Sequence, residues 1–255
     1  MIRMNFEPVK KGFSLTEVLI AVGILAVALT FIAGTFPVGI GLTTVAAERS
    51  IGAIAADEAF VKIKLYGIDL SNTALQTYTM ADFNDVALTQ PDSKEFAYPS
   101  VDTGSPPSYY WSALCRRIDN DSSLVQVTVF VCRKTGEHTQ YPKTAPDTPV
   151  YEWPRPVLIA GATAFRVHKD TPDRLQAPPP FGWGRLVSDN SVIVDDNTGD
   201  IYRVLNRDAD EIFLDRDWPG VTGTITVSIW VVPQAVGGGR NPVIGIYQRI
   251  IKFEP

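Results

Sequence analysis

Residues 10–47 read KKGFSLTEVLIAVGILAVALTFIAGTFPVGIGLTTVAA, and this stretch decides the fold. Between Glu17 and Glu48 it contains no Asp, Glu, Lys or Arg. About 20 apolar residues in a helix are enough to cross the hydrocarbon core of a bilayer, which is roughly 30 Å thick. The sequence therefore predicts a membrane helix near the N-terminus, with its membrane part at about residues 18–38.

Basic residues come before the apolar stretch. Arg3, Lys10 and Lys11 precede it, whereas its other end carries Glu48 and Arg49. Membrane segments tend to keep their more basic flank in the cytoplasm. We therefore expect a single-pass protein of the cytoplasmic (inner) membrane, with its N-terminus in the cytoplasm and the rest of the chain exported.

Two general interpretations of this segment each leave a feature unexplained. A secretory signal has an apolar region of about 7 to 15 residues before its cleavage site, whereas apolar residues here continue well past a possible site at Ala26-Val27-Ala28. A plain single-pass anchor explains the length but not Glu17 at the edge of the apolar run. A charge there costs free energy unless it is paired or reaches the interface.

A third interpretation rests on the motif KKGFSLTEVLIA, which runs from Lys10 to Ala21. It resembles the processing and methylation motif of type IV prepilins and type II secretion pseudopilins. The resemblance implies that a prepilin peptidase cuts between Gly12 and Phe13 and methylates the new amine of Phe13. It also implies that Glu17, the fifth residue of the mature chain, engages the amine of a neighbouring subunit during filament assembly.

Electrostatics supports a role for Glu17 near the new amine. A cation at a helix N-terminus opposes the helix dipole, so the Phe13 amine gains from a nearby carboxylate. Low dielectric strengthens such a pair. The alternative is that Glu17 only reaches to the lipid headgroups as a residue of the helix start.

The helix is expected to continue past the membrane as far as Tyr66, where Gly67 can act as a C-cap. Pro37 and the glycines around it should weaken or kink the helix in its middle. Apolar residues at four-residue steps predict an amphipathic extension of the helix. They are Ile51, Ala55, Ala59 and Ile63.

Residues 67–255 form the exported head, after a leader at residues 1–12 and the helix at residues 13–66. The head reads as β-rich because short runs alternate apolar and polar residues with a period of two. These runs are residues 124–131, 157–167, 191–194, 201–205, 224–232 and 243–253. The sequence thus predicts an α+β fold in which a long N-terminal helix packs on an antiparallel β-rich head.

Three segments between these runs read as irregular. Residues 70–107 are polar and predict loops, and residues 141–156 are rich in proline and predict a loop or a linker between two portions of sheet. Gly237-Gly238-Gly239 lacks the GK[ST] ending of a phosphate-binding loop. A flexible hairpin tip is the better interpretation of these glycines.

Cys115 and Cys132 would face an oxidising compartment in an exported head, which makes a disulfide plausible. Hairpin geometry argues against it: if Arg117 pairs with Leu124, Cys115 faces Gln126, and Cys132 lies about six residues, roughly 20 Å, farther along. A disulfide needs Cα atoms within about 7 Å. The bridge would require another register or an irregular loop, and we expect two free thiols.

Few residues suit metal binding or catalysis. Asp195, Asn197 and Asp200 offer oxygens around a tight turn, as at the start of a calcium loop, but the downstream Glu of an EF-hand is missing, which favours a plain β-turn. His168 and Asp170 are a close histidine and carboxylate pair, yet neighbours on one strand need no catalytic role. The sequence has no CxxC, HExxH or GxSxG motif, so we expect no catalytic residues, metal or cofactor.

The sequence as a whole favours a structural subunit over an enzyme. A net charge of −5 without basic runs argues against a nucleic-acid partner. The favoured interpretation is a minor pilin or pseudopilin, since a bulky head crowds a helical lattice. Expected partners are other pilin or pseudopilin subunits, a prepilin peptidase, an inner-membrane assembly platform and the lipid bilayer. The alternative is a membrane-anchored exported binding or adhesive protein that does not polymerise.

Overall fold

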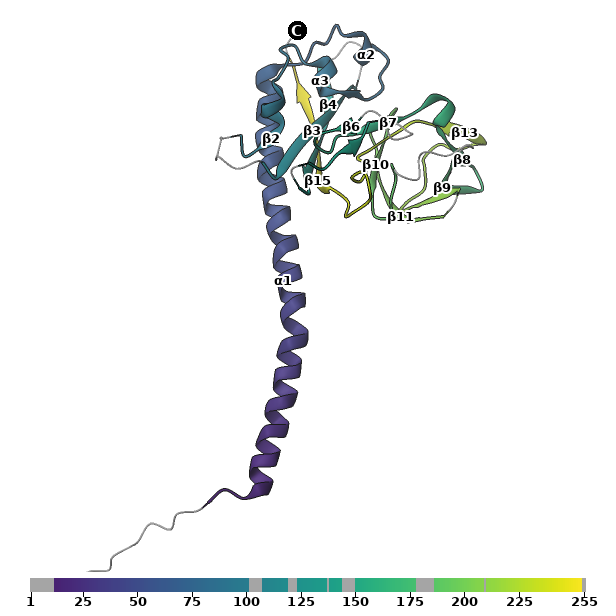
Figure 1. Ribbon diagram of the computed structural model, residues 1–255. Helices are drawn as coiled ribbons and strands as arrows, with labels where there is room; N and C mark the ends of the chain where they lie inside the picture. The colour runs from purple at the N-terminus through teal and green to yellow at the C-terminus, as the bar shows by residue number, and fades with distance from the viewer. Residues whose placement is uncertain are drawn as a thin grey trace, which may run out of the picture. The chain divides into compact units, whose positions relative to one another are not determined.

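The computed structural model describes residues 12–100, 107–118, 123–136, 138–143, 150–177, 186–208 and 210–253 (Figure 1). The chain divides into two compact units, Met1–Glu48 and Arg49–Pro255. One helix, α1 (Leu15–Tyr66), supplies most of the described part of the first unit and the first residues of the second. The long N-terminal helix that the sequence predicts is therefore present.

α1 is 52 residues long and contains Pro37. The helix continues through this proline without a break. Its end agrees with the prediction. Gly67 has a φ of +71°, and its N–H donates to the Ile63 carbonyl at 3.0 Å. A residue without a side chain adopts this left-handed conformation at no steric cost, which is why glycine ends the helix.

The first sheet of the second unit has the strand order β1-β3-β4-β15, with β2 also pairing with β3. Its strands are β1 (Ala81–Asp82), β2 (Ala97–Tyr98), β3 (Tyr109–Arg117), β4 (Leu124–Arg133) and β15 (Val243–Lys252). The second half of α1 packs in the same hydrophobic core as this sheet, where Ala55, Ala59 and Ile63 are fully buried. The predicted amphipathic extension is confirmed.

The segment between α1 and β3 is more ordered than its polar composition predicts. It contains α2 (Thr73–Gln76), α3 (Phe83–Val86) and η1 (Ser93–Phe96). Asn72, Asp82 and Asp92 cap these three short helices through their side chains. Leu75, Phe83 and Val86 are fully buried, so isolated apolar residues fix this segment on the core. Residues 101–106 lie outside the described part.

The second sheet closes on itself into a barrel. Its order is β13-β8-β9-β12-β11-β10-β14-β7. At one end of this order β13 pairs with β8, and at the other end β14 pairs with β7. β7 and β8 follow each other in the chain, as do β13 and β14, so the same two segments pair at both ends and close the sheet. The strands are β7 (Val157–Ile159), β8 (Phe165–His168), β9 (Thr171–Gln176), β10 (Val192–Asp195), β11 (Ile201–Arg207), β12 (Glu211–Leu214), β13 (Thr224–Val227) and β14 (Ile229–Val231).

Three sequence predictions need correction at this barrel. Residues 157–167 and 224–232 each contribute to two strands rather than one, because η2 (Gly161–Thr163) separates β7 from β8 and Ser228 separates β13 from β14. Gly237-Gly238-Gly239 joins β14 of the barrel to β15 of the first sheet, so it is a connection between sheets and not a hairpin tip. In the proline-rich segment, β5 (Tyr141–Pro142) pairs with β6 (Val150–Tyr151), while residues 144–149 lie outside the described part.

The barrel is inserted between two strands that pair with each other. β4 and β15 are antiparallel neighbours, yet the whole barrel lies between them in the sequence. A shared apolar cluster joins the two parts of the head. Leu114 and Phe130 contribute to it from the first sheet, and Val194 and Trp230 contribute from the barrel. The observed fold is thus α+β, with a long helix and an antiparallel β-rich head, as the sequence predicts.

Candidate processing and assembly site

The predicted cleavage junction lies just before α1. Gly12 and Phe13 are outside regular structure, and the helix starts two residues later at Leu15. The Phe13 side chain is 88% exposed, and a methyl group added at Gly12 would meet no atom within 4 Å. The described side of the junction is therefore exposed and lies outside the helix. Lys10 and Lys11 lie outside the described residues.

Glu17 takes part in a capping box at the start of α1. Its Oε2 accepts a hydrogen bond from the Ser14 amide at 2.9 Å, and its own amide donates to Ser14 Oγ at 3.2 Å. These reciprocal bonds satisfy two backbone donors that the first turn of a helix leaves unpaired. The sequence pattern S-x-x-E already indicates this arrangement, but the sequence analysis did not include it.

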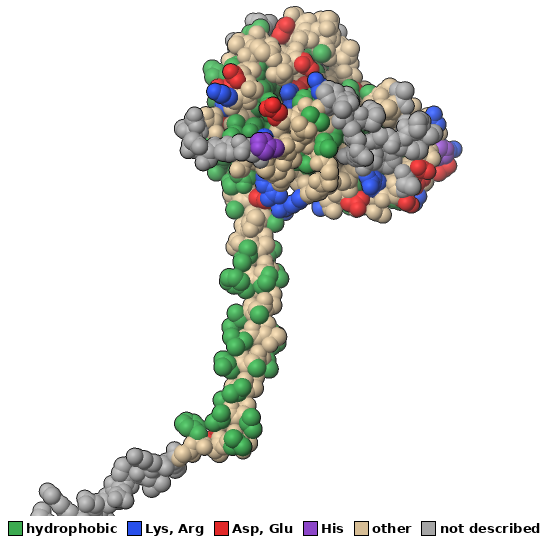
Figure 2. Space-filling view, viewed as in Figure 1, with side chains coloured by type: hydrophobic (Ala, Val, Ile, Leu, Met, Phe, Trp, Pro, Cys, Tyr) green, Lys and Arg blue, Asp and Glu red, His purple; other side chains and the backbone are tan. Residues whose placement is uncertain are grey.

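The first unit presents apolar side chains all along α1 (Figure 2). Leu19, Ile24 and Phe31 are 64%, 66% and 70% exposed. α1 is long and apolar enough to cross a membrane. The hydroxyls of Thr30 and Thr35 donate to carbonyl oxygens one turn earlier, at 2.8 and 3.0 Å, so they need no partner from the lipid.

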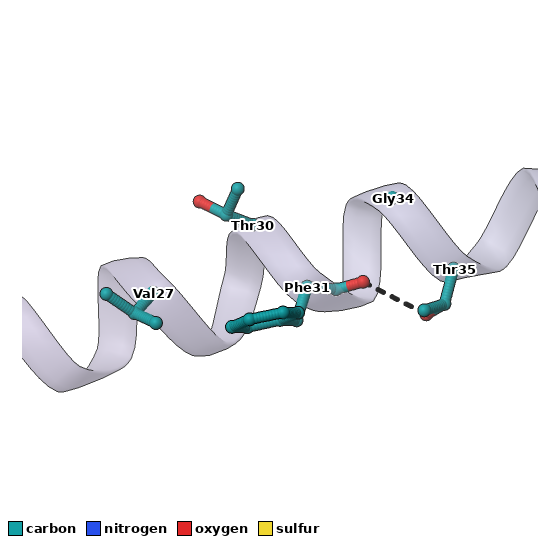
Figure 3. Close-up of a pocket in the computed structure, with 5 residues that line it drawn as sticks. All are labelled: Val27, Thr30, Phe31, Gly34 and Thr35. Atoms are coloured by element: carbon teal, nitrogen blue, oxygen red, sulfur yellow. Dashed lines mark hydrogen bonds between the residues drawn. The ribbon is translucent and has the colours of Figure 1, made fainter.

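A shallow notch lies on this helix around Gly34, with Val27, Thr30, Phe31 and Thr35 as its other lining residues (Figure 3). Thr35 turns its hydroxyl back to the Phe31 carbonyl, which leaves mostly apolar atoms facing outward. Small residues let another helix approach closely in a membrane. The notch lies on the helix that directly follows the processing junction.

Cys115 and Cys132 are both free and fully buried. In the β3–β4 ladder Cys115 pairs with Val127 and Cys132 pairs with Tyr110, one residue away from the register that the sequence analysis assumed. Cys115 belongs to the core under α1, whereas Cys132 belongs to the cluster facing the barrel. The two thiols thus point to opposite faces of one sheet. Burial raises the pKa of both.

The turn at residues 195–200 uses its acidic oxygens internally. Asp195 is 2% exposed, and its carboxylate accepts hydrogen bonds from the Asn197 amide, the Thr198 amide and the Thr198 hydroxyl. Asp200 lies 3.9 Å from an Arg216 nitrogen. Among the described residues no cluster of three histidine, cysteine or acidic side chains could hold a metal ion.

His168 and Asp170 form a surface pair on the barrel. The His168 Nδ1 lies 3.3 Å from an Asp170 carboxylate oxygen, and the side chains are 50% and 71% exposed. Asp170 also donates its backbone amide to His168 Nδ1. The contact is local and exposed to solvent.

Comparison with known proteins identifies the N-terminal element. Residues 8–33 match the family model of the prokaryotic N-terminal methylation motif, which is the prepilin-type signal of pilins and pseudopilins. No curated protein and no solved structure matches the chain. Together with the fold, the signal supports a pilin-like exported protein. More specifically, the prepilin-type cleavage and methylation signal lies at the start of the one candidate membrane helix found among the described residues.

Proposed function

We propose that this chain is a minor pilin or pseudopilin that assembles into a type IV pilus or a type II secretion pseudopilus after processing by prepilin peptidase. One observation carries the proposal. The methylation motif at residues 8–33 spans an exposed, non-helical junction and the start of a 52-residue helix. A signal meant only for export would not need its apolar helix to continue directly into the core of a folded head.

In this proposal the residues around the junction have distinct roles. Gly12 supplies the accessible peptide bond, and Phe13 carries the new methylated amine. Glu17 remains as the carboxylate that meets an amine of a neighbouring subunit in a water-poor setting, where charge pairing is strong. The apolar surface of α1 supplies the contact with lipid before assembly and with other helices afterwards.

The inserted barrel supports the minor rather than the major role. It adds bulk to the head on the face of the first sheet opposite α1, since the two apolar clusters of that sheet are separate. A major subunit repeats along the whole shaft, so room for this bulk would be needed at every position. A minor subunit is present in few copies, so room for the bulk is needed at few positions. We propose a structural role with no catalytic residues. Other subunits, the peptidase and the inner-membrane assembly platform are the proposed partners.

Mass spectrometry of the membrane-extracted protein tests the proposal. We expect an N-terminus at Phe13 that carries a methyl group. Gly12→Val should remain uncut, because the added side chain meets no atom and so disturbs only recognition. Gly23→Ala is the matched control, since it also meets no atom, and it should be cut normally.

The same measurement on sheared filaments counts the copies of this chain. A few copies for each filament are expected of a minor subunit. An intact Met1 start, or a start just after Ala28, in cells that contain the peptidase would contradict the prepilin role. Processing without any recovery in filaments would favour the non-polymerising anchored protein instead.

A further inference from the structure

We propose that the turn at residues 195–200, between β10 and β11, is a polar latch that holds the barrel in a fixed orientation on the first sheet. The apolar cluster between the two parts is not directional, because hydrophobic contact depends mainly on buried area. Orientation must come from hydrogen bonds, whose geometry is restrictive. Several hydrogen bonds between the barrel and the rest of the head involve the turn at residues 195–200.

Three backbone carbonyls of this turn accept hydrogen bonds from the first sheet and the segment leading into it. The donors come from parts of the chain that are far apart in sequence: the residue before β1, strand β3 and strand β15. The pairs are Met80 N–H with Asp196 O at 2.8 Å, Arg116 Nη1 with Asn197 O at 2.7 Å, and Gln248 Nε2 with Gly199 O at 2.9 Å.

The two side-chain donors are held in place by neighbouring strands. Arg116 donates through Nε and Nη2 to the same Gln126 oxygen, at 3.1 and 2.8 Å. Gln248 also donates to the Thr128 hydroxyl at 2.9 Å. Their conformations are therefore fixed by the first sheet itself, which lowers the entropy cost of meeting the turn.

Charge strengthens two hydrogen bonds of this turn. The Arg116 guanidinium, which is always charged, donates to the Asn197 carbonyl, and the Asp196 carboxylate accepts from Trp230 Nε1 at 2.7 Å. Hydrogen bonds that involve an ionised group are stronger than neutral ones, so the contact from Arg116 weighs most among the side-chain contacts between the turn and the first sheet.

Close approach of the turn to the sheet depends on Gly199. It has a φ of +74°, and a side chain there would collide with Met80 Cε and lie 2.7 Å from Gln126 Nε2. Only glycine lets the backbone reach the donors in this conformation. The latch therefore needs a small residue on the barrel and long polar residues on the sheet.

Hydrogen–deuterium exchange on the full chain in detergent tests the latch. Arg116→Met and Gln248→Met each remove one donor while keeping most of the side-chain volume. We expect about tenfold faster exchange in peptides that cover Met80 and residues 195–200, because one cross-sheet hydrogen bond is lost. Exchange within β4 and β11 should not change.

Arg174→Gln is the matched control, since Arg174 contacts Glu211 and Phe213 within the barrel, and it should leave the latch peptides unchanged. Unchanged exchange in both latch variants would overturn the proposal. Unfolding of the whole head in both would also overturn it, because loss of a latch leaves each part folded.

Discussion

At the scale of single residues, Glu17 has one observed role and one proposed role. In the isolated chain its carboxylate completes a capping box with Ser14. In the proposed filament the same carboxylate meets the amine of a neighbouring subunit. Capping requires only a side-chain acceptor, which glutamine also provides, whereas pairing with an amine in a water-poor setting requires the charge.

Glu17→Gln should therefore keep helix capping, membrane insertion and cleavage, and it should reduce recovery in the filament fraction. Glu17→Ala should reduce recovery and also cost about 1 kcal/mol of helix-start stability, because the Ser14 amide loses its acceptor. Ser14→Ala removes the serine half of the box without touching the charge, so it serves as the matched control. The measurement compares processed membrane pools with sheared filaments in one strain.

The pattern across these variants distinguishes the two roles. If Glu17→Gln assembles like the wild type while Glu17→Ala and Ser14→Ala do not, Glu17 acts only as a helix-start residue. Loss of cleavage in Glu17→Gln would place its role at the peptidase.

The cysteines give a second prediction at this scale. Burial raises the pKa of both thiols, and the nearby Asp82 raises the pKa of Cys115 further. A raised pKa keeps the thiol protonated and unreactive at a pH where an ordinary cysteine forms thiolate. Thiol labelling of the native chain should therefore stay slow as the pH rises from 7 to about 9.

The unfolded, unreduced chain should then label at two sites, Cys115 and Cys132. Protection of both until a reductant is added would mean a disulfide, and it would contradict the β3–β4 register in which they face opposite sides.

The end of α1 gives a prediction at the scale of single elements. Gly67→Ala places a side chain in the left-handed conformation and brings it to 3.4 Å from Leu88. We expect a loss of about 1 kcal/mol and a fall in melting temperature of about 2–4 °C for a head of this size. Thermal unfolding of the detergent-solubilised chain measures both.

Gly223→Ala is the control for this change, because Gly223 lacks a positive φ and an added methyl group there meets no atom. Its melting temperature should match that of the wild type. An equal fall in both variants would mean that the loss at Gly67 does not come from its backbone conformation.

The sequence predicted the elements whose apolar pattern extends over most of their length. α1 has a long apolar run and a clear stop at Gly67, and β4 places a valine at every second position from Val125 to Val131. β9 and β12 were missed, because β9 is mostly polar with one buried residue and β12 has four residues. Pairing within a closed barrel stabilises such short strands, and a local pattern cannot show that pairing.

The candidate site was predictable to a similar degree. The junction at Gly12 and Phe13 and the carboxylate of Glu17 lie within one contiguous motif, and the motif itself is confirmed. The latch could not be predicted, because its donors Met80, Arg116 and Gln248 meet only after the sheet has formed. Its acceptors are backbone carbonyls, which carry no sequence signal.

At the scale of the whole molecule, the head combines a helix-covered sheet with a barrel whose sequence is inserted between two strands of that sheet. The barrel leaves from β4 and returns to β15, which are direct neighbours, so the sheet could form the same ladder with a short connection. The barrel is thus an addition to the sheet rather than a part of its construction. This arrangement fits a subunit whose helix follows the common filament plan while its head is specialised.

The position of β15 also sets the order of events while the chain crosses the membrane. β15 is the last described strand, and about 110 residues separate it from its partner β4. A chain that emerges from its N-terminal end releases every strand of the barrel before β15 appears. Parts of a chain that emerge together tend to fold as units. The barrel can therefore finish folding before β15 is available to pair with β4. Pairing of β4 with β15 therefore follows the emergence of every strand of the barrel.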